Sequence, residues 1–244
     1  MACKRFRNVI HLDVVDSTNT FLKNSISSFP DGTVVFANNQ TAGRGKLDRK
    51  WIGKESCSIF CSFLTKDINS PLDAIRFNFK FSLIIKKVMQ LYTDSTNLKL
   101  KWPNDILSGN NKKICGILSE YADHSVITGV GINIKPFETP SEINQVTDFL
   151  ENISAEEINL ELFQQQLIEE ANCYFDKTKD FQAESFPGIW YNEARIADSK
   201  IAVQTGIKTT TGIITGITDY GALLILTDNN EKIAITTGDI TYYD

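Results

Sequence analysis

Short β-strand patterns dominate the first 135 residues of this chain, so its fold has to be organised around a sheet. Runs of alternating, or of β-branched and aromatic, residues recur between turn-forming residues. The predicted strands are Val9–Val15, Thr33–Ala37, Ser58–Leu64, Leu98–Trp102, Ile114–Glu120 and Ser125–Ile134. Apolar stripes at helical spacing predict helices over Asp73–Leu91 and Asn159–Phe175. Asn144–Asn152 is predicted as a short helix and Phe181–Trp190 as irregular chain.

The composition changes near residue 196, where short strands rich in Thr, Ile and Leu begin. Turns that carry Gly, Asp and Asn separate these strands and indicate hairpins. The predicted strands are Ile201–Thr205, Thr210–Thr218, Gly221–Thr227 and Lys232–Thr236. About 45 residues of this kind predict a small SH3-like β-barrel. We therefore expect a domain over residues 1–195 and a second one over residues 196–244.

The overall charge and the apolar runs exclude several classes of protein. A net charge of −5 gives no electrostatic support to general nucleic-acid binding. No apolar run reaches the roughly 18–20 residues that a membrane-spanning helix needs. The first eight residues are basic, but no apolar signal-peptide core follows them. These features predict a cytoplasmic protein without a membrane or DNA partner.

Cysteine and histidine are too sparse for several kinds of site. The five cysteines are an odd number without a Cys-x-x-Cys pair, which predicts free thiols. Cys57 and Cys61 would share one face of a strand, most simply as small packing residues. The chain has only two histidines, His11 and His124, so a His-rich metal site is excluded and a Ser-His-Asp triad is disfavoured.

The segment from Gln40 to Trp51 combines two glycines with four cations. Gly43 and Gly45 stand one residue apart, and four Lys or Arg side chains fall within seven residues. Glycine allows close backbone approach to a ligand, and turn N–H groups backed by cations form an anion site. The alternative for such a loop, taken alone, is a solvated basic surface.

Other polar or glycine-bearing segments stand at predicted strand ends. Asp16-Ser17-Thr18-Asn19 either caps a following helix or offers hydroxyls and N–H groups to a polar ligand head. Pro103 ends a predicted strand and leaves Lys101, Asn104 and Asp105 projecting beside it. Gly116, and the glycines at 129 and 131, leave strand faces bare, which suits either close packing or a flat ligand.

Taken together and in order, these segments resemble the biotin protein ligases (biotin–[biotin carboxyl carrier protein] ligases) over most of the chain. The motifs that carry the resemblance are Asp16-Ser17-Thr18-Asn19, Gln40-Thr41-Ala42-Gly43-Arg44-Gly45, Lys101-Trp102-Pro103-Asn104-Asp105, Lys113-Ile114-Cys115-Gly116-Ile117-Leu118, Gly129-Val130-Gly131-Ile132-Asn133 and Tyr220-Gly221-Ala222-Leu223. The chain departs from the family pattern at Lys46, where Arg is common, and at Leu47-Asp48, where Arg-Gly is common. It also departs at Gly53-Lys54-Glu55-Ser56, which lacks the glycine that usually stands just before the next strand.

The resemblance implies an α+β fold. Its main part would be a mixed β-sheet flanked by helices, as in class II synthetases and lipoate ligases, followed by the small SH3-like barrel. Some members carry an N-terminal winged helix that represses transcription. Because the first motif here begins at Asp16, we expect the monofunctional type without a DNA-binding domain.

The resemblance also implies a chemistry and a set of site residues. Biotin would be activated by ATP to biotinyl-5′-AMP, and the biotinyl group would then pass to a lysine of a carrier protein. Lys113 and Arg44 match the catalytic positions. The positions that match the biotin side are Ser17, Thr18, Asn19, Gln40, Gly43, Arg44, Gly45, Lys46, Lys113 and Gly116. Those that match the ATP side are Arg44, Lys46, Arg49, Asn104, Asp105, Lys113 and Asn133.

Cofactors and partners follow from the same resemblance. ATP and biotin would be substrates, and Mg²⁺ would accompany the nucleotide. Asp105 is left with two roles, orienting Lys113 or holding Mg²⁺. The protein partner would be the biotin carboxyl carrier protein of acetyl-CoA carboxylase or of another biotin-dependent carboxylase, and the chain would act as a monomer or homodimer. The alternatives are a lipoate or octanoate ligase, and a biotin-binding protein without turnover.

Overall fold

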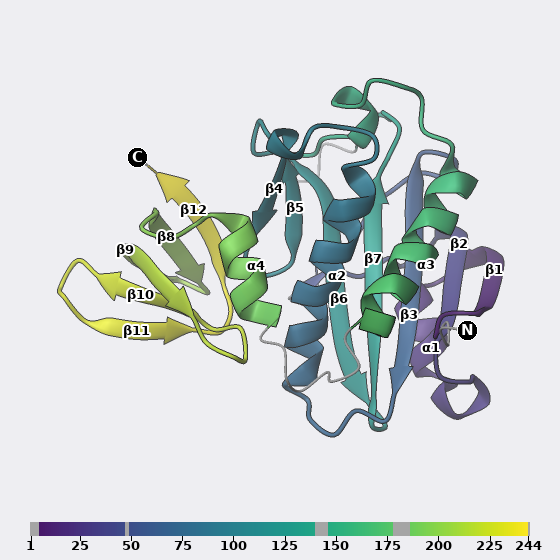
Figure 1. Cartoon of the computed structure of the whole chain (residues 1–244), viewed down its shortest axis with the longest axis horizontal. Helices are drawn as coiled ribbons and strands as arrows, with labels where there is room; N and C mark the ends of the chain where they lie inside the picture. Colours follow the sequence, from purple (N-terminus) through teal and green to yellow (C-terminus); the bar gives the residue numbers. More distant parts are fainter. Residues whose placement is uncertain (1–4, 47–48, 140–145, 178–185, 244) are drawn as a thin grey trace.

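The computed structural model describes residues 5–46, 49–139, 146–177 and 186–243, and within them it shows a seven-stranded sheet (Figure 1). Its strand order is β1-β2-β3-β7-β6-β5-β4. The strands are β1 Asn8–Val15, β2 Thr33–Gln40, β3 Ser58–Lys66, β4 Leu98–Lys101, β5 Asp105–Ser108, β6 Lys113–Ala122 and β7 Ser125–Asn133. β1 pairs with β2 in parallel, and the other pairs are antiparallel. The mixed sheet predicted from the sequence is confirmed.

Helices cover both faces of this sheet (Figure 1). The helices are α1 Thr18–Lys23, α2 Asp73–Met89, α3 Leu160–Lys177 and α4 Phe186–Ala194, with short 3₁₀ segments at Ile26–Ser28, Ser95–Asn97 and Leu150–Asn152. Alternate residues of β2 separate the two faces, since Val34 packs in the large core beneath α2 and α3, whereas Val35 packs beneath α1. Burial of these alternating apolar residues fixes the register of the sheet.

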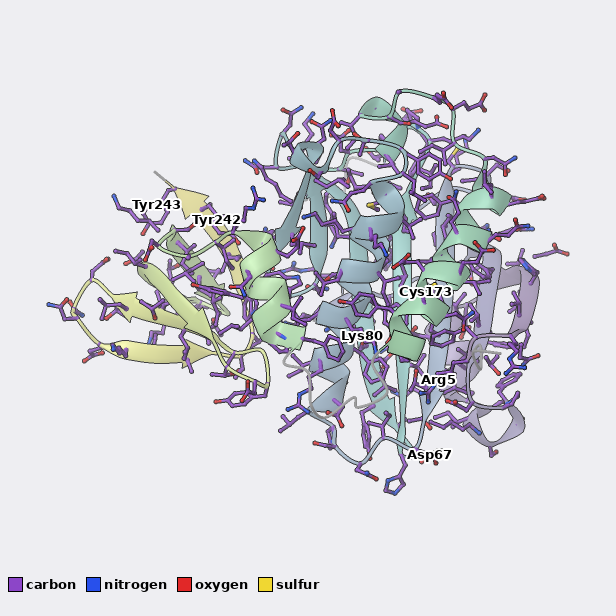
Figure 2. The ribbon with its side chains drawn as sticks, viewed as in Figure 1. Arg5, Asp67, Lys80, Cys173, Tyr242 and Tyr243 are labelled. Atoms are coloured by element: carbon purple, nitrogen blue, oxygen red, sulfur yellow. The ribbon has the colours of Figure 1, made fainter. Side chains whose placement is uncertain are left out.

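The α2–α3 layer contains a fully buried lysine. Lys80 on α2 has no exposed surface, and its Nζ lies 3.5 Å from the ring centre of Phe175 and 4.7 Å from that of Phe186. Figure 2 shows Lys80 facing α3, the helix that also carries Cys173. Aromatic faces attract a cation, so the rings of Phe175 and Phe186 stabilise the buried ammonium of Lys80 between the helices. None of the helices in the described part of the chain is long and apolar enough to cross a membrane.

The C-terminal part forms a separate five-stranded antiparallel sheet with the order β11-β10-β9-β8-β12. Its strands are β8 Lys200–Thr205, β9 Lys208–Ile217, β10 Leu223–Thr227, β11 Lys232–Ile235 and β12 Asp239–Tyr243. The sheet matches an SH3-like unit in strand content, but its order leaves β11 and β12 as edges, so the predicted barrel does not close. Figure 2 shows Tyr242 and Tyr243 near the outer end of β12.

One buried hydrogen bond joins the two sheets. The indole Nε1 of Trp102, at the end of β4, donates to the carbonyl oxygen of Gly221 at 2.9 Å. Gly221 packs against α2, because a Cβ at this position would lie 2.3 Å from the Phe79 ring. These contacts fix the C-terminal sheet beside the strand end that the sequence predicts to carry functional residues.

Three predictions about secondary structure need correction or limits. Phe181–Trp190 was predicted as irregular, but α4 occupies its described part from Phe186 onward. The predicted helix over Asn144–Asn152 is reduced to a 3₁₀ turn at Leu150–Asn152, and residues 144–145 lie outside the described chain. The sequence patterns also missed β5 and β12.

Candidate active site

A pocket opens between the main sheet and the C-terminal sheet. It is bordered by the start of α1, the end of β2, the loop after β2, and strands β5, β6 and β7. Its lining residues are Ser17, Thr18, Asn19, Gln40, Arg44, Gly45, Lys46, Arg49, Lys50, Trp51, Ile52, Asn104, Asp105, Lys113, Gly116, Ile117, Leu118, Gly129, Val130, Gly131, Asn133, Thr147, Gly238 and Asp239. Every site residue predicted from the sequence lines this pocket except Gly43, which is adjacent in the loop.

Polar side chains at the start of α1 form a connected network at one end of the pocket. Gln40 Oε1 accepts hydrogen bonds from the Thr18 backbone N at 2.8 Å and from its Oγ1 at 3.2 Å. Ser62 Oγ lies 2.7 Å from Thr18 Oγ1 and 2.6 Å from Asn19 Oδ1. Ser17 is the N-cap of α1, yet its side chain makes no capping hydrogen bond. The network therefore fixes the orientation of hydroxyl and amide groups that face the pocket.

Arg44 is held at the same end by a carboxylate that the sequence analysis did not identify. Its NH1 and NH2 groups donate to Glu120 on β6 at 3.3 and 3.1 Å. Lys23 on α1 and the Asn19 amide also donate to Glu120, each at 3.0 Å. Burial acts to raise the pKa of Glu120, but the hydrogen bonds from Asn19 and Lys23 and the charge of Arg44 outweigh it and lower this pKa.

Lys113 marks the other end of the pocket. Its Nζ lies 2.7 Å from Oδ1 of Asp105, the first residue of β5. Its backbone is braced as well, because Lys113 N donates to the Val146 carbonyl and its own carbonyl accepts from Asp148 N, both at 2.9 Å. Both side chains are largely buried, with about 16% of Lys113 and 13% of Asp105 exposed. The position of the ammonium is thus set by the Asp105 carboxylate and by a hydrogen-bonded backbone.

The floor between these two ends is a flat patch made by two glycines and covered by an indole. Gly116 of β6 and Gly131 of β7 are directly opposite each other in the sheet. A Cβ added to Gly131 would lie 2.2 Å from Cε2 of Trp51, and one added to Gly116 would lie 2.8 Å from Cζ3. Only glycine therefore admits this ring. The indole Nε1 of Trp51 is buried without a hydrogen-bond partner in the described chain.

Asn104 and Asn133, two asparagines that line the pocket, differ in whether their side chains are already hydrogen-bonded. The Nδ2 group of Asn104 donates to the Ile117 carbonyl at 2.7 Å, and Ile117 N donates back to the Asn104 carbonyl at 2.9 Å. Asn104 is therefore a structural link between the strand end and β6. The Oδ1 atom of Asn133 is buried and has no hydrogen-bond partner within the described residues. A buried acceptor of this kind is costly unless a ligand or water supplies a donor.

The C-terminal sheet supplies one wall of the pocket. Arg49 forms a two-pronged ion pair with Asp239, the first residue of β12, and its NH1 lies 3.1 Å from Oδ1. The hydrogen bond with Asp239 raises the pKa of Arg49, and the same bond lowers that of Asp239. Burial lowers the pKa of Lys46, whereas the charges of Asp239 and Asp105 oppose this shift. Lys46 Nζ lies 5.6 Å from the ring centre of Trp102.

Sequence reasoning missed three acidic or polar members of this site, and one of its predictions lies outside the described chain. Glu120, Thr147 and Asp239 belong to none of the motifs, and their role appears only when the chain is folded. Leu47 and Asp48, where the chain departs from the family pattern, lie outside the described residues. Trp51 lines the pocket, whereas Trp102 is buried in the core.

The described residues contain no cluster of three or more His, Cys, Asp or Glu side chains that could hold a metal ion without help from a ligand. Among the residues that the structure describes, Asp105 and Asp239 are the carboxylates that line the pocket. Mg²⁺ in nucleotide sites usually keeps several waters and binds through one or two carboxylates together with phosphate oxygens. The donor set here is compatible with an ion that arrives with a nucleotide.

Comparison with known protein families assigns both parts of the chain. Residues 11–136 match the family described as Biotin/lipoate A/B protein ligase family. Residues 199–241 match the family described as Biotin protein ligase C terminal domain. The first match includes both ends of the pocket, from Ser17 to Asn133, and the second includes Asp239.

Individual relatives cover most of the chain. It is 30% identical to the "Bifunctional ligase/repressor BirA" of Bacillus subtilis, over 93% of this chain and 71% of that protein. It is 27% identical to a "Biotin--[acetyl-CoA-carboxylase] ligase" of Mycobacterium tuberculosis, over 95% of this chain and 88% of that protein. Among solved structures, the biotin protein ligase of Aquifex aeolicus in complex with biotin and ATP superposes with a TM-score of 0.77 at 26% identity, covering 98% of this chain and 99% of that one.

Proposed function

This chain belongs to the biotin/lipoate A/B protein ligase family, and we propose from that premise that it activates biotin with ATP and transfers it to a carrier protein. The observation that carries the proposal is that Arg44 and Lys113, from distant segments, line one pocket with the polar network of Thr18 and Gln40. The similar Aquifex protein was solved in complex with biotin and ATP. The enzyme is a ligase of the type named biotin–[acetyl-CoA-carboxylase] ligase.

The first reaction joins the two small substrates. A carboxylate oxygen of biotin attacks the α-phosphorus of ATP, the bond to the β-phosphate oxygen breaks, and pyrophosphate leaves. The product is the mixed anhydride biotinyl-5′-AMP. The obstacle is the meeting of two anions and the charge that develops on phosphorus, which fixed cations relieve. The chain supplies such cations without a nucleophile of its own.

Lys113 is the central group in this proposal. Asp105 and the paired backbone hold its ammonium in one place, so little reorganisation is needed when the substrates bind. Lys113 would contact the biotin carboxylate and the α-phosphate together. Arg44, Lys46 and Arg49 add positive charge from the loop side. A cation fixed before the reaction stabilises the transition state more effectively than one that has to be recruited.

The two ends of the pocket suit the two ends of the intermediate. Ser17, Thr18 and Gln40 present the hydroxyl, amide and N–H groups that a cyclic urea pairs with, and we assign them, with Asn19, to the ureido ring of biotin. Asn133 has an unpaired buried acceptor, which suits the amino group of adenine. Between the ends, the Gly116–Gly131 patch and Trp51 provide an apolar surface for the acyl chain.

Magnesium is proposed as the companion of the nucleotide. Asp105 and Asp239 are the residues that would hold it through water or directly, and it would neutralise charge on the phosphates.

The second reaction transfers the biotinyl group. The ε-amine of a carrier lysine attacks the carbonyl carbon of the anhydride, the bond to the phosphate oxygen breaks, AMP leaves and the amine loses a proton. The carrier is proposed to be a biotin carboxyl carrier protein, because the relative from Mycobacterium tuberculosis is named as a ligase that acts on acetyl-CoA carboxylase. The pocket is not enclosed, and Asp239 of the C-terminal sheet lines it, so a protruding lysine can reach it.

A direct assay tests this function. The protein is incubated with ATP, Mg²⁺ and either biotin or lipoate, and pyrophosphate release is measured before a carrier domain is added. Biotin-dependent release followed by biotinylation of one carrier lysine supports the proposal. Release with lipoate in place of biotin identifies a lipoate ligase, the other activity named in the family description. Binding of biotin without any pyrophosphate release identifies a protein without turnover.

A further inference from the structure

Glu120 accepts four hydrogen bonds from three residues on two separate segments, α1 and the loop after β2, and none of the steps described above uses it. Its carboxylate accepts from NH1 and NH2 of Arg44, from Nζ of Lys23 and from Nδ2 of Asn19. Only about 14% of its side chain is exposed, whereas about 44% of the Arg44 side chain is exposed. A largely buried carboxylate on β6 thus binds a more exposed guanidinium.

The Arg44 pair connects the loop after β2 to the sheet. The loop is folded on itself, since Trp51 N donates to the Gly43 carbonyl at 2.9 Å and Gly45 N donates to the Arg49 carbonyl at 2.7 Å. This small hairpin contributes Arg44, Gly45 and Lys46 to the pocket. The side-chain link between it and β6 is the two-pronged pair with Glu120. Breaking that link would leave the hairpin intact and still held by Arg49 and Asp239 on its other side, but it would release the Arg44 end from β6.

The Arg44–Glu120 pair and the Lys113–Asp105 pair lie at different positions along β6. Glu120 lies four residues beyond Gly116, or roughly 13 Å along a strand that rises about 3.3 Å per residue. Lys113 and Asp105 pair near Gly116. In this structure the guanidinium of Arg44 therefore lies at the polar end of the pocket, where Glu120 holds it.

We propose that Glu120 is a positioning residue that holds Arg44, and with it the Gly43–Lys46 loop, against the pocket so that the activated intermediate is shielded from water. The inference rests on the proposed function, because the mixed anhydride is the species that needs shielding. Its structural part, the pinning of the loop, stands independently of the reaction. Bidentate pairs between arginine and a carboxylate are among the stronger hydrogen-bonded contacts in proteins, which suits a residue that holds a loop in place.

Limited proteolysis tests the structural part without any catalysis. Trypsin cuts after Lys and Arg, and the loop carries Arg44, Lys46, Arg49 and Lys50. The variant Glu120→Gln keeps the size of the side chain and an acceptor for Asn19 but removes the charge. We expect its loop to be cut three- to tenfold faster than in the wild-type protein. The matched control is Lys23→Gln, which removes the other cation from Glu120 outside the pocket and should be cut at the wild-type rate.

A second variant guards against misfolding of the first. Arg44→Gln removes the same pair from the loop side, and cutting at Lys46 and Arg49 should rise by a similar factor. The double variant should be no more sensitive than either single one, because both remove one interaction. Cutting of the folded Glu120→Gln protein at the wild-type rate would overturn the proposal, as would slower cutting.

The functional part is read from intermediate that escapes. With ATP and biotin but no carrier, leaked biotinyl-5′-AMP is hydrolysed by water to biotin and AMP, so AMP accumulates. We expect at least fivefold faster AMP formation by Glu120→Gln than by Lys23→Gln or wild type. An unchanged or lower rate would show that Glu120 does not retain the intermediate. A wild-type protein that forms no AMP with biotin and no biotinylated carrier would refute the proposed function, whereas the proteolysis result would still decide the pinning.

Discussion

The ammonium of Lys113 lies 2.7 Å from Oδ1 of Asp105 because an irregularity in the sheet turns the lysine toward the pocket. Asp105 is opposite Gly116, and Ile106 is opposite Cys115, but the next residue, Leu107, pairs with Lys113 rather than with residue 114. The extra residue in β6 is a bulge, and bulges re-aim side chains next to active sites. Without the bulge, Lys113 and Gly116 would point to opposite faces of β6. With the bulge, Lys113 lies on the same face as Gly116.

Removal of this ammonium is the most direct test of the mechanism. We expect Lys113→Ala to lower the rate of biotin-dependent pyrophosphate release at least hundredfold, equivalent to about 2.7 kcal/mol of barrier. The physical reason is the loss of the fixed cation between two anionic substrates. Lys99→Ala, which removes an exposed lysine that bonds the Gly109 carbonyl on the same sheet, is the control and should retain the wild-type rate. A rate within threefold of wild type in Lys113→Ala would remove this residue from its assigned role.

The pair between Arg49 and Asp239 predicts that the C-terminal sheet takes part in nucleotide binding. Asp239→Asn should raise the KM for ATP three- to tenfold and change kcat less, because Arg49 loses the carboxylate that holds it and Lys46 loses a nearby negative charge. The pKa of Asp239 is lowered by the bond from Arg49, so the pair is present above the usual aspartate range and is lost only as pH falls through that lowered pKa. Assays at neutral pH therefore report the intact pair.

Arg76→Gln is the matched control for that experiment. Arg76 on α2 also reaches the C-terminal sheet, since its Nε donates to the Asp219 carbonyl at 3.1 Å, but it does not line the pocket. It should leave the KM for ATP unchanged. An equal rise in both variants would mean that general loosening of the two sheets, and not the charge of Asp239, controls the nucleotide.

Local patterns were sufficient for most of the main sheet but not for elements that depend on distant partners. The strands of the main sheet that carry alternating or β-branched apolar residues could be predicted, because in strands such as β2, β3 and β7 these residues are buried in the cores on the two faces. Helix α4 was missed, since its nine residues carry a short pattern and its Trp190 packs on Phe79, 4.9 Å between ring centres, from a different part of the chain. β12 was missed because its pairing with β8 joins segments about 40 residues apart.

The same reason separates the site residues that could be predicted from those that could not. Residues in Gly-Arg-Gly and Lys-Trp-Pro-Asn-Asp are recognisable because several chemical groups occur together in sequence. Glu120 and Asp239 are single carboxylates among many, and each becomes part of the site only by pairing with an arginine 76 or 190 residues away. No local pattern contains that information. The floor of the pocket is an intermediate case, since the bare glycine faces were visible but the indole that covers them was not.

The lowered pKa of Lys46 predicts a specific pH dependence. Burial, the largest influence, favours the neutral amine, so Lys46 loses its charge below the ordinary value of 10.5. If Lys46 binds phosphate oxygens, the KM for ATP should rise as pH increases through the alkaline range below that value. Lys46→Arg restores the common family residue and stays charged, so its KM should remain flat. Parallel rises in both proteins, measured between about pH 7.5 and 9.5, would assign the effect to another group.

The glycine floor gives a prediction about biotin itself. A methyl group at Gly131 would lie 2.2 Å from Cε2 of Trp51, so Gly131→Ala has to displace the indole. Overpacking of this kind costs about 1–3 kcal/mol, and the displaced ring would intrude on the acyl-chain surface. We expect biotin to bind at least tenfold more weakly, as measured by calorimetry.

Gly216→Ala in the C-terminal sheet, where the nearest side-chain atom is an ordinary 3.5 Å away, is the control and should bind biotin normally. The smaller ring in Trp51→Phe should recover part of the loss when combined with Gly131→Ala, because the conflict is steric. Undiminished affinity in Gly131→Ala would mean that biotin does not lie against this strand pair.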